Sequence, residues 1–74
     1  MGYSIRAEMV ASVHSLESQQ GDHVAIGDTI MILESMKMEI PVLTEHAGSI
    51  MEISVQPGDV VREGDVLAII SAEG

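Results

Sequence analysis

Short apolar segments separated by Gly-Asp pairs run through the whole chain. Residues 29–33 and 66–70 are compact runs rich in β-branched side chains, and turn-forming residues bound each of them. No window sustains the 3.6-residue spacing of apolar positions that an amphipathic helix needs. Glycine accepts positive φ and aspartate bonds to neighbouring backbone groups, so each Gly-Asp pair predicts a turn. The pattern therefore predicts an all-β chain of short, buried strands.

The pattern repeats itself after 37 positions. Two such halves indicate a pseudo-twofold domain, because solenoid arrays need about three units to be stable. Short strands with regularly spaced turns then favour a sandwich or small barrel in which the two halves intertwine. The superposed positions include Val13 with Ile50, Leu16 with Ile53, Ile30 with Leu67, Ile32 with Ile69, Gly21 and Asp22 with Gly58 and Asp59, and Gly27 and Asp28 with Gly64 and Asp65.

Local irregularities are predicted within this frame. Residues 13–16 and 50–53 space their apolar side chains by three where a plain strand uses two, which predicts a bulge at the same place in each half. Pro41 cannot donate to a central ladder, so residues 38–43 are expected to form an edge strand with the Pro41 nitrogen facing outward. Residues 1–74 are expected to form one domain, since no linker or low-complexity tract interrupts them.

Lys37 lies at the junction between the two halves. The strands on either side of it are almost contiguous, which predicts a hairpin whose tip includes Met36 and Lys37. Tight hairpin turns favour Asn, Asp or Gly, and forcing another residue into positive φ costs about 1 kcal/mol or more. A locally unfavourable turn that presents a lysine suggests a function maintained at some cost to stability.

Composition excludes several classes of protein. The 74 residues include 12 Asp or Glu against 3 Lys or Arg, a formal net charge of -9, so neither nucleic acid nor a membrane surface is an expected partner. The apolar runs are far shorter than the roughly 20 residues of a spanning helix, and the chain is expected to be cytoplasmic. Without Cys there are no disulfides or thiolate sites. So small a domain leaves little room for an enclosed active site.

The five residues from Glu34 to Met38, Glu-Ser-Met-Lys-Met, resemble the biotin attachment motif of the biotinyl/lipoyl attachment domain family. Nearly the whole chain shares the resemblance, because the family also has the duplicated Gly-Asp-x-Val-x-x-Gly-Asp pattern found at residues 21–28 and 58–65. The resemblance implies a flattened β-sandwich, or barrel-sandwich hybrid, of two four-stranded antiparallel sheets with pseudo-twofold symmetry. Lys37 would lie exposed on a hairpin, with the termini at the opposite end.

The resemblance is to the biotin carboxyl carrier type, and it implies covalent biotin on Lys37, attached by biotin protein ligase. The biotinyl arm would shuttle a carboxyl group between the sites of a biotin carboxylase and a carboxyltransferase. The domain itself would be a non-catalytic, monomeric carrier. Met36 and Met38 are expected to contact the ligase, while Glu34 and Glu39 are expected to contribute less or to be solvated hairpin charges.

Two alternatives stay open at this point. The first is a lipoyl carrier of an oxo-acid dehydrogenase-like system, with lipoate on Lys37, although Met38 departs from the Asp-Lys-Ala that lipoyl domains usually show. The second is an unmodified binding module with the same fold. A metal site is not expected, because His14, His23 and His46 are scattered and lack ligand spacing.

The chain departs from the family pattern at Glu8, Ala11, Ser35 and residues 44–47. These departures affect the expected loop conformations and the choice of partner protein more than the expected carrier role of Lys37. The link over residues 17–21 is too short for the protruding thumb of some bacterial acetyl-CoA carboxylase carriers, so a thumbless subtype is expected. The complete repeat frame favours a free-standing carrier.

Overall fold

The computed structural model describes residues 2–72, and within them every regular element is a strand. Two four-stranded sheets form, in the orders β1-β8-β6-β3 and β5-β4-β2-β7, and every pairing is antiparallel. The predictions of an all-β chain and of two four-stranded antiparallel sheets are confirmed. The strands are β1 (Gly2–Arg6), β2 (Ala11–Leu16), β3 (His23–Val24), β4 (Thr29–Ser35), β5 (Met38–Leu43), β6 (Gly48–Ile53), β7 (Val60–Val61) and β8 (Val66–Ala72).

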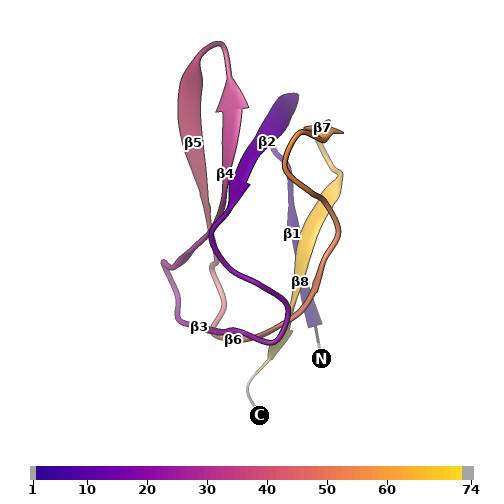
Figure 1. The fold of residues 1–74 in the computed structure, drawn as a ribbon. Coiled ribbons are helices and arrows are strands. Elements are labelled where there is room, and N and C mark those ends of the chain that lie inside the picture. The colour runs from indigo at the N-terminus through magenta and orange to yellow at the C-terminus, as the bar shows by residue number, and fades with distance from the viewer. Residues whose placement is uncertain (1, 73–74) are drawn as a thin grey trace.

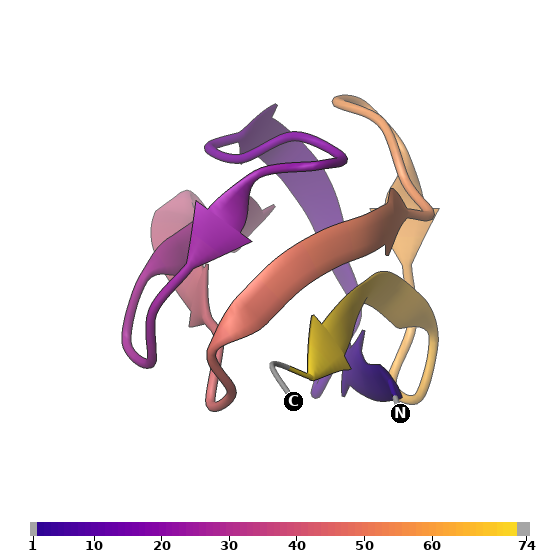
Figure 2. The ribbon, with the colours of Figure 1, turned by 90° about the horizontal axis from the view of Figure 1, so that it is seen from below.

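The 37-residue repeat of the sequence is also the repeat of the structure. Adding 37 to the bounds of β2, β3 and β4 gives those of β6, β7 and β8, and β1 maps onto β5 with a difference at one end. The two sheets are therefore equivalent, since β1, β8, β6 and β3 of one correspond to β5, β4, β2 and β7 of the other. Figures 1 and 2 show the strands wrapped around a shared interior.

Turns of one half bond to the backbone of the other half. The Gly21 amide donates to the carbonyl of Ile50 at 2.8 Å, and the equivalent Gly58 amide donates to the carbonyl of Val13 at 2.8 Å. Asp22 closes its own turn by accepting the Gln19 amide on Oδ2 at 2.9 Å, and Asp28, Asp59 and Asp65 repeat this bond to the residue three positions earlier. The Gly-Asp pairs are therefore structural turns, as the sequence predicts.

The core lies between the sheets and is built from aliphatic side chains. Ile30, Met31, Leu67 and Ile70 are fully buried, and Ile50 is 1% exposed. Burying a side chain of this size stabilises a fold by about 1.5–3 kcal/mol, so a core without Phe or Trp depends on many such contacts. Ile32 and Ile69, which the repeat also superposes, are only half-buried.

The predicted irregularities are present. The β2–β4 register shifts between Val13 and Ser15, and the β6–β8 register shifts at the equivalent step between Ile50 and Glu52. The strand β5 is at the edge of its sheet, and Pro41 is exposed there. Both bulges and the edge position of residues 38–43 are therefore confirmed.

The β4–β5 hairpin projects from one end of the molecule. In Figure 1 its tip lies at the top, whereas the start of β1 and the end of β8 lie at the bottom. These two ends are neighbours, because Gly2 pairs with Ser71. The Cα atoms extend over 38 × 18 × 17 Å. No helix in residues 2–72 is long and apolar enough to cross a membrane.

Candidate functional site

The hairpin tip is a two-residue turn made by Met36 and Lys37. Ser35 of β4 pairs with Met38 of β5, so only these two residues connect the strands. Their φ values are 53° and 65°, both in the left-handed region. Positive φ at both central residues defines the type I′ turn, which matches the right-handed twist of the flanking strands. The predicted hairpin tip is therefore confirmed, and its two residues are of types that disfavour positive φ.

The turn presents its side chains to solvent. Lys37 is exposed, and it forms no hydrogen bond or ion pair with any residue of the described chain. Met36 is 89% exposed and Met38 is 59% exposed. Methionine usually fills cores and is adaptable when it meets another surface, so two exposed methionines beside a free lysine form a small apolar contact surface.

Two carboxylates face each other below the tip. Glu34 of β4 pairs directly with Glu39 of β5, and both side chains are exposed. Like charges opposite each other across a ladder are destabilising. His14 of β2 lies on the same side, with Nε2 3.8 Å from Oε2 of Glu39. The hairpin base is therefore acidic beneath the single lysine.

The neighbouring strand β2 also holds the hairpin in place. Ser12 pairs with Glu34, and its Oγ donates to the Glu34 carbonyl at 3.4 Å. The sequence does not single out Ser12, and it brings in His14 only as a candidate metal ligand that lacks the required spacing. Their proximity follows from the packing of β2 against β4, which the repeat alone does not specify.

The three histidines are not brought together as a site. His14 lies near Glu39, His46 stacks on the ring of Tyr3 with centroids 3.6 Å apart, and His23 Nδ1 lies 3.3 Å from Ser49 Oγ. Across the part of the chain that the structure describes, three or more His, Asp or Glu side chains nowhere gather in a geometry that could hold a metal ion.

A duplicated β-sandwich that presents a lysine at the tip of a projecting hairpin has the architecture of a carrier domain. A family model described as biotin-requiring enzyme matches residues 2–70. The chain belongs to this biotinyl/lipoyl family. Carrier domains of the family are non-catalytic parts of biotin-dependent carboxylases.

The chain is similar over most of its length to small bacterial proteins. The biotinylated protein TB7.3 homologue of Mycobacterium leprae (strain TN) is 49% identical over 71 residues, which are 96% of this chain and 100% of the relative. The biotin/lipoyl attachment protein of Bacillus subtilis (strain 168) is 37% identical over 68 residues, which are 92% of this chain and 93% of the relative.

A solved structure of a carboxylase contains the same fold. The urea carboxylase of Kluyveromyces lactis matches with a TM-score of 0.90 and 31% identity, over 96% of this chain and 6% of that protein. The chain thus corresponds to a small part of that enzyme. Together with the family match, the comparison identifies a biotin carboxyl carrier-type domain.

Proposed function

We propose that Lys37 is the residue that carries biotin, joined to its Nζ through an amide. The observation that supports this is the geometry of the turn: the chain's only lysine is exposed, unpaired within residues 2–72 and held at the tip of the hairpin. A covalent group on this side chain meets no obstruction from the domain. The residues present therefore fit a covalently attached arm.

The attachment reaction is chemistry that a separate biotin protein ligase would perform. Amide formation needs a neutral amine with a free lone pair, so the ligase supplies the base that the attack by Nζ requires. The neutral Nζ then attacks the acyl carbon of a biotinyl adenylate, and the C–N bond forms as the bond to the AMP phosphate breaks. We expect Met36 and Met38 to contact the ligase, and Glu34 and Glu39 to contribute less or to remain solvated hairpin charges.

The carrier role follows from the tether. Bound biotin supplies the ring nitrogen on which a carboxyl group is carried, and the domain moves it from a biotin carboxylase site to a carboxyltransferase site. A short flexible link gives an effective concentration on the order of millimolar without a tight complex. The domain works as a cytoplasmic monomer, and a net charge of -9 directs it towards basic surfaces on these partners.

A lipoyl group on Lys37 is the second candidate. The relative from Bacillus subtilis is named as a biotin/lipoyl attachment protein, and 93% of it is covered. The same exposed Nζ would form an amide with a lipoyl carboxyl group, and the domain would then act in acyl or redox transfer. Met38 in place of Ala after the lysine favours biotin.

Intact mass after expression with both a biotin protein ligase and a lipoyl ligase tests the two candidates. We expect the increment of one biotinyl group on the wild-type chain and none on Lys37→Arg. The double variant Lys37→Arg/Arg62→Lys is the matched control, since it keeps one lysine and the same net charge but moves the amine to another exposed position.

The control variant is expected to stay unmodified, because modification depends on the turn and not on having a lysine. A lipoyl increment would replace the leading proposal with the second candidate. An unmodified wild-type chain, beside a control carrier that is fully biotinylated, would leave only a binding module with this fold.

A further inference from the structure

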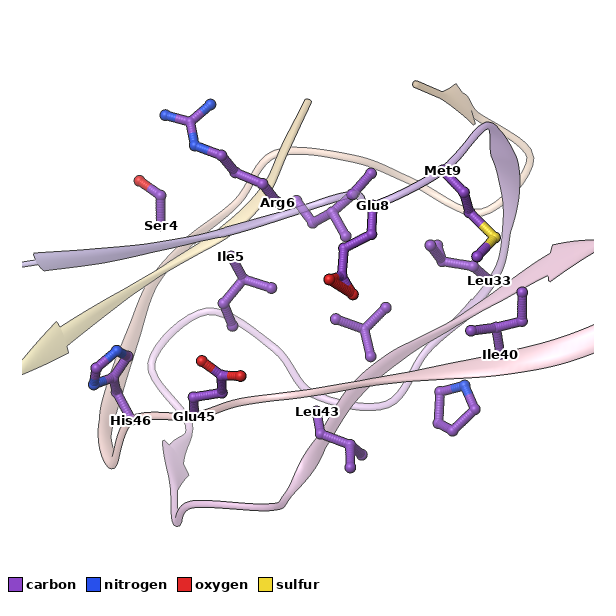
Figure 3. Close-up of a pocket in the computed structure, with 14 residues that line it drawn as sticks. Ser4, Ile5, Arg6, Glu8, Met9, Leu33, Ile40, Leu43, Glu45 and His46 are labelled. Atoms are coloured by element: carbon purple, nitrogen blue, oxygen red, sulfur yellow. The ribbon is translucent and has the colours of Figure 1, made fainter. Parts of the chain in front are cut away.

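A groove opens between the sheets where the edge strands β1 and β5 approach each other. It has a volume of about 370 Å³ and is lined by apolar side chains that include Ile5, Leu33 and Val42. The repeat superposes Ile5 on Val42, so the groove lies across the pseudo-twofold axis. Figure 3 shows His46 at one end and Met9 at the other. The volume lies near the lower limit of the range of about 300–1,000 Å³ typical of ligand sites.

Two carboxylates border this groove. Figure 3 shows Glu8, which follows β1, and Glu45, which follows β5, pointing into the opening from opposite sides. Within residues 2–72, neither carboxylate has a hydrogen-bond or ion-pair partner. Arg6, the cation nearest in sequence to Glu8, points away and donates from Nη1 to the carbonyl of Gly64 at 2.8 Å. The groove therefore favours a cationic group on an aliphatic stem.

The backbone beside the groove also has free hydrogen-bonding capacity. In the described chain β1 pairs with β8 alone and β5 with β4 alone, so each has one unpaired edge. Pro41 removes a donor from the middle of the β5 edge, whereas β1 contains no proline. Unpaired edges accept an added strand. Both edge strands supply lining residues of the groove, so a segment added to the free edge of β1 would lie beside it.

We infer that this groove binds an extended segment of a partner protein in which apolar residues stand two positions before and after a Lys or Arg, so that all three side chains share one face. The segment pairs its backbone with β1, lays its apolar side chains over Ile5 and Val42, and places its basic side chain between Glu8 and Glu45. A second copy of this chain is a poor occupant, because each copy has a formal net charge of -9. The inference does not depend on the group that Lys37 carries.

Nuclear magnetic resonance titration of the full chain tests the inference. The probe is a blocked pentapeptide, Val-Thr-Lys-Thr-Val, whose valines and lysine share one face of an extended strand, added to protein labelled on its amides and methyl groups. We expect shifts concentrated in β1 and in the methyl groups of Ile5 and Val42. A peptide with glutamate in place of lysine should bind at least about tenfold more weakly, because it loses the charge pairs with Glu8 and Glu45. A peptide with a methylated backbone should lose at least as much, because it cannot pair with β1.

A pair of charge-matched variants separates the groove from the general acidity of the surface. Glu8→Gln/Glu45→Gln should weaken binding by about tenfold. Glu17→Gln/Glu52→Gln removes the same charge from exposed sites elsewhere and should change binding by less than about twofold. All four positions are exposed, and retained amide dispersion verifies the fold of each variant.

Several results would overturn the inference. One is equal weakening in both double variants, or shifts spread over the whole acidic surface, since either indicates non-specific charge attraction. Shifts at Ile5 and Val42 on biotinylation alone, with exclusion of the peptide, would assign the groove to the biotinyl arm. Shifts that depend on protein concentration without peptide would assign it to a second copy.

Discussion

Lys37 is the only side-chain amine in the chain. An acylating enzyme therefore meets just one other amine on this protein, the α-amino group. Acylation of Lys37 removes one positive charge and moves the formal net charge from -9 to -10. Few other amines therefore compete with Lys37 for acylation. The residues next to Lys37 are what distinguish it from an ordinary surface lysine.

Met38 should matter to the ligase more than an equally exposed methionine elsewhere. Met38 is 59% exposed beside Lys37, and Met51 is 53% exposed on β6 near Gly2, at the other end of the molecule. We expect Met38→Ala to lower kcat/KM for biotinylation by about tenfold, which corresponds to losing about 1.4 kcal/mol of apolar contact. Met51→Ala should leave it within about twofold. Equal effects of the two substitutions would contradict a contact role for Met38.

At the scale of the element, the hairpin combines two well-paired strands with a turn whose residues disfavour the backbone conformation they adopt. The strands β4 and β5 pair along most of their length, and β2 supports β4 from the other side. These pairings hold Met36 and Lys37 at positive φ although neither residue favours it. The strained turn persists because the strand pairing on both sides fixes the positions of its two ends.

Relieving this strain should stabilise the protein. We expect Met36→Asn to raise the free energy of unfolding by about 1 kcal/mol, because Asn tolerates left-handed backbone at the first position of a type I′ turn. For a domain of this size that corresponds to a rise in Tm of about 4–8 °C. Gln20→Asn, at an exposed turn position without positive φ, is the control and should be nearly neutral. Thermal unfolding followed by circular dichroism measures both, and a Met36→Asn variant no more stable than the wild type would show that the turn is unstrained.

At the scale of the molecule, the two halves depend on each other. The β2–β4 and β6–β8 pairings lie within a half, whereas the β1–β8, β3–β6, β2–β7 and β4–β5 pairings join the halves. The Gly-Asp turns add reciprocal backbone bonds across the same division. A half alone would expose one face of the core and leave most of its strand edges unpaired.

Cleavage at the single lysine tests this dependence. A lysine-specific protease should cut the unmodified chain once, after Lys37, and leave residues 1–37 and 38–74 associated as a folded complex. Each fragment, separated in denaturant and then returned to buffer alone, should give the amide spectrum of an unfolded chain. Biotinylated protein is the control and should resist the protease, since its lysine is an amide. An isolated half with dispersed amide signals would show that the halves fold independently.

Much of this architecture was predictable from particular residues. The turns at Asp22 and Asp59, the bulges after Val13 and Ile50, and the edge position of Pro41 each follow from local chemistry or from the repeat. The two-residue tip at Met36 and Lys37 was predicted against local turn preference, because the flanking strands leave no room for another connection. The groove was not predicted, since Glu8 looks like a loop departure until Glu45 is found facing it.

The sequence by itself determined the strands, the turns, the twofold repeat and the lysine at its centre, because these depend on side-chain periodicity and on backbone preferences within a few residues. Apart from the β4–β5 hairpin, only the tertiary structure decided which strands become neighbours. Pairing between strands far apart in the chain is set by how the two halves bury one shared core. That packing brought His14 close to Glu39, left β1 and β5 as facing edges, and placed two unpaired carboxylates across the opening between them.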